Sequence, residues 1–148
     1  AGITPFVEEA ERQGFTMLQN EAVLRGPFRI AGMDDGFSDH ADLAKTMDAL
    51  GALPDGVPVL VTHTPDVIPS LDGNFAAVFA GHTHCGQISL PLIGPISTFS
   101  LYGRRFACGD ITDEGQRIFV GAGLGTSLLP LRFGVPPDVW LVSFGPED

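Results

Sequence analysis

Positive charge is scarce in this sequence. Lysine and arginine together number 8 against 18 aspartate and glutamate residues, so the 148-residue chain has a formal net charge of −10. Proteins that bind nucleic acids neutralise the phosphates with clustered lysine and arginine, and this chain has too few to build such a surface. We therefore expect no nucleic-acid partner, and an anionic substrate would need a metal ion to offset the protein's charge.

Long apolar runs are also lacking. No apolar run is close to the length of a membrane helix, which is about 20 residues. No signal-peptide pattern is present at the start of the sequence, so the localisation stays unknown. There is no internal repeat, and the 19 glycines and 12 prolines are spread along the chain rather than gathered in a linker. We expect one domain over residues 1–148, which is long enough for a proper hydrophobic core.

Cysteine is rare as well. The only two, Cys85 and Cys108, form neither a Cys-x-x-Cys pair nor a disulfide framework, so they do not indicate a cellular compartment. We expect both to be small buried residues, as free cysteines usually are. Cys85 directly follows His84, so a thiolate at this position could instead join a metal site.

The pattern of apolar residues predicts two helices. A Thr-Pro pair at residues 4–5 is typical of a helix start, and Ser38 or Asp39 would cap a second helix that stops at Gly51. The apolar face of the second helix consists of Leu43, Met47 and Leu50.

Strands are predicted between and after these helices. Two apolar runs, at residues 57–62 and 75–80, indicate buried neighbouring strands that are parallel and joined by helical turns at residues 64–71. Such alternation of strands and helices is typical of an α/β (α+β) fold with mixed sheets. Further strands are expected at residues 15–19, 28–33, 102–107, 116–120 and 138–144, with a turn at 113–115, and those after Pro91 should be antiparallel.

Three histidines stand where these buried strands end. His63 follows the first run, and His82 follows the second through Gly81, with His84 two residues further on. In extended backbone, a spacing of two points both side chains to one side, and ligands of open sheets gather beyond the carboxyl ends of the strands. Neutral imidazole is a common metal ligand, so the three residues predict a metal site, although a solvated His-Thr-His turn has the same pattern.

Other polar groups near strand ends have less specific patterns. Asp34 and Asp35 precede Gly36 and could bind a metal ion or form a solvated turn, which we favour because Asp-Gly is a common turn pair. His40 has no partner at ligand spacing, so we interpret it as a surface residue away from the other histidines. The glycines of residues 121–125 form no dinucleotide-binding fingerprint.

The same stretch resembles the calcineurin-like metallophosphoesterases. Gly81-His-Thr-His84 is similar to the last metal motif of that family, and residues 61–66 are similar to its preceding histidine motif. Similarity to one bacterial branch continues at Gly86-Gln-Ile88, Leu124-Gly-Thr-Ser127, Pro130-Leu-Arg132 and Pro136-Pro137. The opening family motifs Asp-x-His and Gly-Asn-His-Asp/Glu do not occur, so the chain resembles the back half of such a protein, with one layer pair of the αββα sandwich incomplete.

The resemblance implies roles for single residues. His63 and His82 would bind one divalent ion and His84 a second, the ions being Mn, Fe or Zn in the parent protein. Further ligands and the proton donor would belong to the absent motifs, so the catalytic residues stay unknown. Asp34, Asp35, Cys85 and Arg132 are candidates for contact with the substrate or with the ligands. Arg132 could bind a phosphate oxygen or form a structural salt bridge.

Two functions therefore compete. The first is the back half of a binuclear metal-dependent hydrolase of phosphate mono- or diesters, whose substrate is a small phosphorylated molecule. Alone, the chain would bind metal weakly or not at all and would be inactive. The second is a non-catalytic module that acts, or associates with itself, through an exposed apolar face, since charged residues make up only 18% of the chain against about 25% in typical domains.

Overall fold

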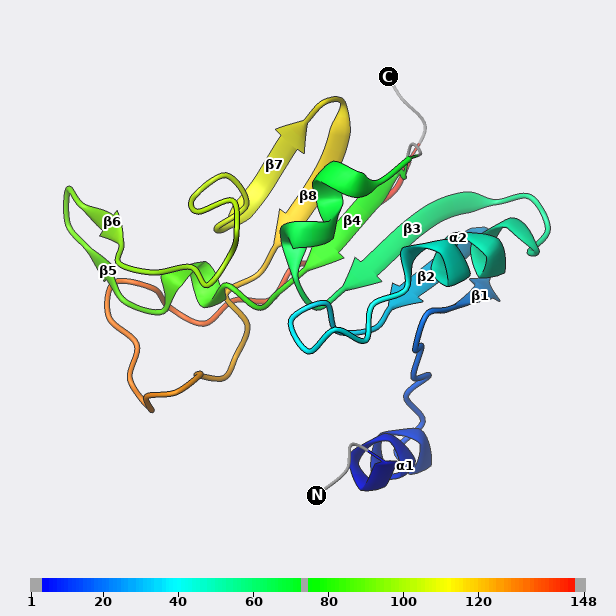
Figure 1. Ribbon diagram of the computed structural model, residues 1–148, viewed down its shortest axis with the longest axis horizontal. Coiled ribbons are helices and arrows are strands. Elements are labelled where there is room, and N and C mark those ends of the chain that lie inside the picture. Colours follow the sequence, from blue (N-terminus) through cyan, green and yellow to red (C-terminus); the bar gives the residue numbers. More distant parts are fainter. Residues whose placement is uncertain (1–3, 73–74, 146–148) are drawn as a thin grey trace.

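A computed structural model describes residues 4–72 and 75–145 as a mixed sheet with helices on one face (Figure 1). Six strands pair in the order β1-β2-β3-β4-β8-β7. These strands are β1 (Glu21–Arg25), β2 (Phe28–Met33), β3 (Val57–Thr62), β4 (Ala77–Ala80), β8 (Gln116–Val120) and β7 (Gly109–Asp113). A separate pair consists of β5 (Ser89–Leu90) and β6 (Gly94–Pro95). The α/β fold class is confirmed.

The centre of the sheet is parallel and its two edges are antiparallel hairpins. Strands β2, β3, β4 and β8 run in the same direction, whereas β1 pairs antiparallel to β2, and β7 antiparallel to β8. The predicted parallel pairing of β3 and β4 is confirmed, as is the helical connection between them, the 3-10 helix η1 (Pro65–Ser70). Thr62 lies opposite Ala80 in the register, so both chains leave the sheet at the same edge.

The hydrophobic core lies between the sheet and the helices α2 (Leu43–Gly51) and η1. Side chains of successive residues point to opposite faces of a strand, so only every second residue of each strand enters this core. Leu60, Val78, Ile118 and Val120 supply the sheet side and are fully buried. From α2, Leu50 is buried and Leu43 and Met47 pack partly buried against the cluster, which confirms the predicted apolar face.

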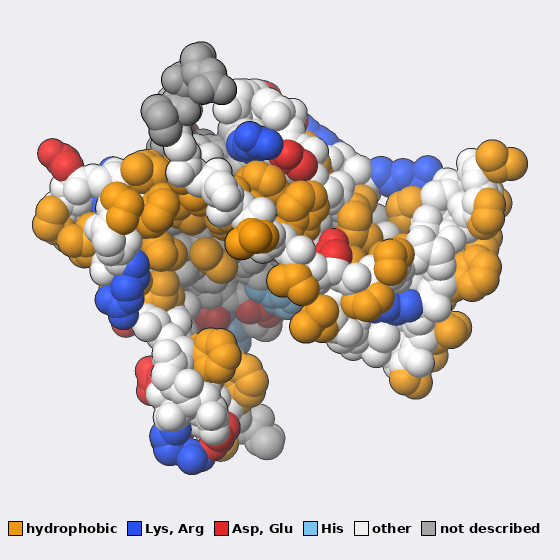
Figure 2. All heavy atoms as spheres, turned by 180° about the vertical axis from the view of Figure 1, so that it is seen from behind, with side chains coloured by type: hydrophobic (Ala, Val, Ile, Leu, Met, Phe, Trp, Pro, Cys, Tyr) orange, Lys and Arg blue, Asp and Glu red, His pale blue; other side chains and the backbone are white. Residues whose placement is uncertain are grey.

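The second face of the sheet is covered in part by the C-terminal stretch. Trp140 packs on Phe119 with ring centroids 5.4 Å apart, and Phe144 packs edge-on against Phe28 at 4.9 Å. Figure 2 shows apolar side chains gathered over this side of the molecule. Val61, on the same face, keeps 44% of its surface exposed. The predicted strand at residues 138–144 is wrong, because these side chains pack across the sheet and their backbone joins no ladder.

Two further strand predictions are wrong. The tight turn at Gly26–Pro27 pairs Arg25 with Phe28, so the strand before the turn is β1 and not residues 15–19. Residues 15–19 pack against the sheet without pairing, and Gly32 is required there because a Cβ would lie 2.3 Å from that of Leu18. Residues 102–107 form turns instead of a strand, and the partner of β8 is β7.

One helix start also differs from expectation. Asp42, and not Ser38 or Asp39, caps α2, because its side chain accepts a hydrogen bond from the Lys45 N–H at 2.9 Å. The predicted N-terminal helix is present as α1 (Thr4–Arg12), which has no buried residue and extends away from the sheet (Figure 1). No helix in the described parts of the chain has the length and apolar character needed to cross a membrane.

Beyond the edge where β4 and β8 end, residues 84–108 and 121–138 form what we call the loop lobe. It contains little regular structure besides η2 (His84–Gly86), β5 and β6. A disulfide joins Cys85 to Cys108, so the expectation of two free cysteines is wrong. A cysteine count gives no spatial distance, whereas in the fold the two Cα atoms lie 4.7 Å apart.

Candidate metal centre

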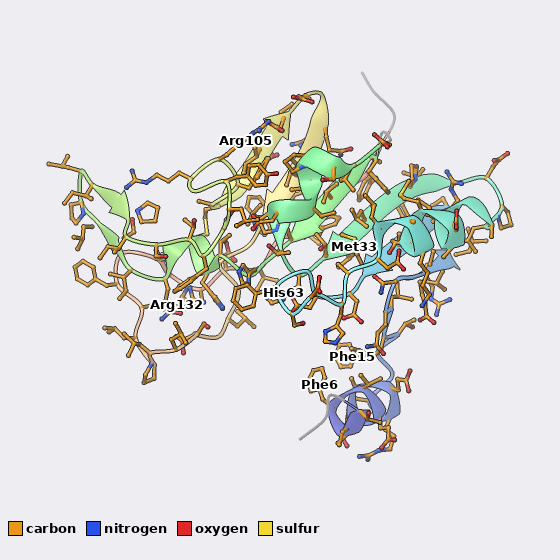
Figure 3. All side chains as sticks on the ribbon, viewed as in Figure 1. Phe6, Phe15, Met33, His63, Arg105 and Arg132 are labelled. Carbon is orange, nitrogen blue, oxygen red and sulfur yellow. A yellow bond between two sulfur atoms is a disulfide. The ribbon has the colours of Figure 1, made fainter. Side chains whose placement is uncertain are left out.

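His63 and His82 meet at the edge where β3 and β4 end. Each directly follows its strand or its strand-end glycine, and the level ends of the two strands bring the rings to a centroid distance of 4.8 Å. The rings are nearly perpendicular, at 85°. Nε2 of His63 lies 3.3 Å from Nδ1 of His82. Figure 2 shows histidine side chains in a hollow next to acidic side chains, and Figure 3 places His63 at this edge.

Asp35 holds the other side of the His63 ring. Its Oδ1 lies 2.6 Å from Nδ1 of His63. The same carboxylate accepts hydrogen bonds from the backbone N–H groups of Phe37 and Ser38 and from the Ser38 hydroxyl. Partial burial raises the pKa of Asp35, but the hydrogen bonds from Ser38, His63 and Phe37 outweigh it and lower the pKa to about 2. Asp35 is therefore an anion at neutral pH. The turn predicted at Asp35 is present, and its carboxylate also orients the His63 ring.

The outer nitrogens of both rings face groups that can only accept a hydrogen bond. Nδ1 of His63 faces the Asp35 carboxylate, and Nε2 of His82 lies 3.2 Å from the backbone carbonyl of Phe99. In neutral rings these outer nitrogens therefore carry the hydrogens. The inner nitrogens then present lone pairs to each other across 3.3 Å, an arrangement that a cation or an added proton between them would satisfy.

The spacing of this pair suits a metal ion. Two nitrogens bound to one zinc ion at about 2.0 to 2.1 Å and at the tetrahedral angle lie about 3.3 to 3.4 Å apart. A carboxylate behind the ligand, as Asp35 stands behind His63, is typical of metal-binding histidines. Within residues 4–72 and 75–145, however, no group of three or more His, Cys, Asp or Glu side chains is arranged around one point. These residues thus supply two ligand nitrogens to a cation and not a complete set of metal ligands.

His84 makes different contacts. Its Nδ1 lies 3.2 Å from the carbonyl oxygen of Ala122 and 3.5 Å from Nη2 of Arg132. Because the carbonyl can only accept, Nδ1 carries the hydrogen and Nε2 has a free lone pair. In the described structure His84 thus contacts the loop after β8, whereas His63 and His82 contact each other. The common centre for all three histidines stays a prediction.

The backbone around these histidines is strained. His82, His84, Cys85 and Gln87 all have positive φ values, between 48° and 65°. Residues other than glycine adopt this left-handed region at a cost on the order of 1 kcal/mol each, and they tend to do so at functional sites. The loop is fixed from both sides, because the buried Thr83 hydroxyl donates to the Ala107 carbonyl at 2.7 Å and Cys85 is bonded to Cys108.

The remaining candidates lie around or beside this centre. Asp34 accepts a hydrogen bond from the Gln19 side chain at 3.3 Å. His40 is exposed, as predicted, but it precedes α2 and lines the same pocket of about 580 Å³ as His63, so the expectation that it lies away from the site is wrong. The cause is the turn at Asp35, since Ser38 bonds both to Asp35 and to Nδ1 of His40.

Cys85 and the segment Gly109–Asp113 cannot belong to the metal centre, because other residues already bind their side chains. Cys85 is bonded to Cys108, so it has no thiolate to offer to a metal ion. Gly109–Asp113 has the letters of another opening motif of the resembled family, Gly-Asp-x-x-Asp. Its aspartates instead pair with arginines, Asp110 with Arg117 of β8 and Asp113 with Arg105 of the turn before β7, both at 2.8 Å. The string is therefore part of β7 and not of a metal site.

Sequence reasoning missed two groups that orient the histidines. The contact of Asp35 with His63 could have been inferred, because β2 and β3 are parallel neighbours and both residues follow the ends of these strands. The Phe99 carbonyl, which contacts His82, carries no signal in the sequence, since every residue has a carbonyl and residues 98–103 form irregular turns.

Comparison with known proteins gives several bacterial relatives. An uncharacterized metallophosphoesterase of Bacillus subtilis, YkuE, is 37% identical over 133 residues, which cover 85% of this chain and 45% of the relative. An uncharacterized metallophosphoesterase of Helicobacter pylori (strain J99) is 30% identical over 99% of this chain and 40% of its own length. The UDP-2,3-diacylglucosamine pyrophosphatase LpxG of Chlamydia trachomatis is 31% identical over 86% of this chain and 41% of its own length.

The chain thus spans less than half the length of these relatives. No family model matches the sequence, and no solved structure matches it.

Proposed function

Since the chain belongs to the calcineurin-like metallophosphoesterase family, we propose that it forms part of a metal-dependent phosphoester hydrolase. His63 and His82 would hold one divalent ion, and His84 would bind a second through Nε2. The observation that carries this proposal is the pair of facing lone pairs on His63 and His82, 3.3 Å apart, with Asp35 and the Phe99 carbonyl fixing the outer nitrogens.

A bound pair of divalent ions would supply Lewis acids for a phosphoryl oxygen. The residues of this chain would orient that pair: Asp35 fixes the His63 ring, the Phe99 carbonyl fixes the His82 ring, and the Ala122 carbonyl fixes the His84 ring. With a net charge of −10, the protein would repel an anionic phosphate unless such cations were bound.

The substrate class that fits is a phosphate mono- or diester, or the pyrophosphate bond that the name of the chlamydial relative indicates for that protein. The metal could be Mn, Fe or Zn. Three neutral imidazoles leave most of the charge of two ions uncompensated. We therefore propose that the isolated chain binds metal weakly and hydrolyses no phosphoester, and that further ligands lie elsewhere in a longer protein.

Titration calorimetry with Mn²⁺ and Zn²⁺ tests the metal site. We expect weak binding by the wild-type chain and none by His63→Ala or His82→Ala, while Asp35→Asn should weaken binding by roughly 10-fold to 100-fold because the ring loses its ionised partner. His40→Ala is the matched control, since His40 lines the same pocket but its Nδ1 bonds to the Ser38 hydroxyl and not to the rings of His63 and His82. Equal binding by all five proteins would contradict the proposal and would favour a shared proton between the rings.

Activity is tested with an aryl phosphodiester and added Mn²⁺, on this chain and on a longer protein that contains it. We expect turnover only by the longer protein. Turnover by the chain that disappears in His84→Ala would show that the chain's own ligands suffice.

An inactive longer protein would favour the second candidate, a binding module. The exposed side chains Phe6 (66%), Phe15 (67%) and Val61 (44%) support that candidate, and sedimentation would reveal self-association through them.

A further inference from the structure

Arg132 holds the loop that follows β8. One of its nitrogens, Nη2, shares its two hydrogens among three backbone carbonyls of that loop, those of Ala122 at 2.7 Å, Gly123 at 3.0 Å and Gly125. Figure 3 shows Arg132 within the loop lobe. The Ala122 carbonyl is the same oxygen that accepts a hydrogen bond from Nδ1 of His84. Arg132 and His84 therefore share one acceptor.

The guanidinium forms no ion pair with the described residues. No carboxylate of residues 4–72 and 75–145 lies within 4.0 Å of its nitrogens, so the salt-bridge interpretation of Arg132 is wrong for this part of the chain. Its Nε and Nη1 atoms are buried and have no hydrogen-bond partner among these residues. Contact of Arg132 with a substrate phosphate stays a prediction, and the contacts that the structure shows are those with the loop.

From this geometry we infer that Arg132 is a positioning residue for His84. By binding the Ala122 carbonyl, Arg132 fixes the oxygen that receives the Nδ1 hydrogen of His84, and this selects the tautomer whose Nε2 is free. Two donors converge on that oxygen at 2.7 and 3.2 Å, so the 3.5 Å approach of Nη2 to Nδ1 brings two donors together and is not a hydrogen bond. That the free Nε2 then binds metal rests on the proposed function.

The rest of the loop is held without Arg132. The Gln87 side chain accepts a hydrogen bond from the Ser127 N–H at 2.6 Å and donates to the carbonyls of Ser127 and Leu129, both at 3.0 Å. The Phe133 carbonyl and N–H also pair with the backbone of Ser89 and Gln87. Asp138 also accepts a hydrogen bond from the Gly123 N–H at 3.1 Å. Loss of the guanidinium should thus loosen the Ala122 carbonyl and the His84 ring without unfolding the lobe.

The tautomer of His84 can be measured by long-range ¹H–¹⁵N NMR on histidine-labelled protein at a pH where the ring is neutral, with His84→Gln to assign the signals. We expect the Nδ1–H tautomer in the wild-type chain and a mixture of both tautomers in Arg132→Met. Arg132→Lys should restore part of the preference, because an ammonium can still donate to the Ala122 carbonyl. Arg104→Met is the matched control, since this exposed arginine of the same lobe bonds to Pro95 and not to the loop.

A second readout is metal affinity, which we expect Arg132→Met to lower by roughly 10-fold to 100-fold, as loss of a group that orients a metal ligand does. An Nε2–H tautomer in the wild-type chain, or an unchanged tautomer in Arg132→Met, would overturn the inference. If Arg132→Met does not fold, the tautomer of His84 measured in the wild-type chain and in Arg132→Lys tests the inference. If the wild-type chain binds no metal, the proposed function fails while the tautomer still tests the role of Arg132.

Discussion

The six-stranded sheet and the loop lobe are stabilised by different means. In the sheet, fully buried side chains such as Leu60, Val78 and Ile118 form one continuous core with α2 and η1. Among the described residues of the lobe, Phe106 joins the core of the sheet, and the separate buried apolar cluster of the lobe consists of Cys85, Ala122 and Val135. Polar and covalent contacts take the place of a core there: the disulfide, the Arg132 hydrogen bonds and the Gln87 hydrogen bonds.

The histidines lie where these two regions meet. His63 leaves the packed sheet directly, so the rigid ends of β3 and β2 fix its position against Asp35. His84 belongs to the lobe and depends on single contacts with Ala122. Rigid elements hold side chains more precisely than loops do, so His63 should keep its geometry under conditions that displace His84.

The largest effect is expected from a cavity in the sheet. Leu60→Ala removes a fully buried side chain from the core and should lower the free energy of unfolding by about 2 to 5 kcal/mol. Urea unfolding followed by the fluorescence of Trp140, the only tryptophan, would measure this loss. Leu128→Ala is the matched lobe variant, because Leu128 is 84% exposed and its truncation should change stability by less than about 0.5 kcal/mol. A similar loss in both variants would abolish the contrast between the regions.

The disulfide should give the next largest effect, confined to the lobe. Cys85 and Cys108 are 23 residues apart, and a loop of that size contributes roughly 3 kcal/mol in the chain-entropy model. After reduction with dithiothreitol, we expect amides of the lobe to lose protection from hydrogen exchange while those of β3 and β4 keep it. The Cys85→Ser/Cys108→Ser variant, with and without reductant, controls for other effects of the thiol. Equal loss of protection in β3 would show that sheet and lobe unfold together.

The same contrast explains what the sequence could predict. Apolar runs located β2, β3, β4 and β8, and apolar spacing located α2, because these elements bury side chains in the core. The helical connection η1 was expected because β3 and β4 were predicted to be parallel. Apolar residues also predicted strands that the structure does not have, at residues 15–19, 102–107 and 138–144. Turn positions and packing across the sheet decide the conformation of these segments. His63 and His82 were predicted to meet because level parallel strands bring their ends together. The disulfide and the contacts of the Phe99 and Ala122 carbonyls could not be predicted, because they depend on the path of loops whose sequence has no regular apolar pattern.

The smallest effect is expected from acid, and it separates two carboxylates. The folded-state pKa of Asp35 is about 2, below its ordinary value of 3.8, so its contribution to stability is complete above about pH 4 and is lost as the pH falls toward 2. The difference of about two pKa units corresponds to roughly 2.5 kcal/mol, or nearer 1 after allowance for partial exposure. The free energy of unfolding of Asp35→Asn should therefore depend less on pH between 5 and 2.

Asp110 on the β7–β8 hairpin offers the comparison. Its hydrogen bond with Arg117 lowers the pKa of its carboxyl, so its contribution is also lost as the pH falls, but the pair is exposed to solvent. About 0.5 M salt should screen the Asp110–Arg117 attraction and spare most of the Asp35 contribution, because Asp35 is partly buried and its bonds to Phe37 and Ser38 are short-range. Urea titrations of the wild type, Asp35→Asn and Asp110→Asn at low and high salt would measure both. If salt erased the Asp35 effect as fully as that of Asp110, the turn at the sheet edge would be an ordinary exposed loop, and Asp35 could not be the fixed partner that orients His63.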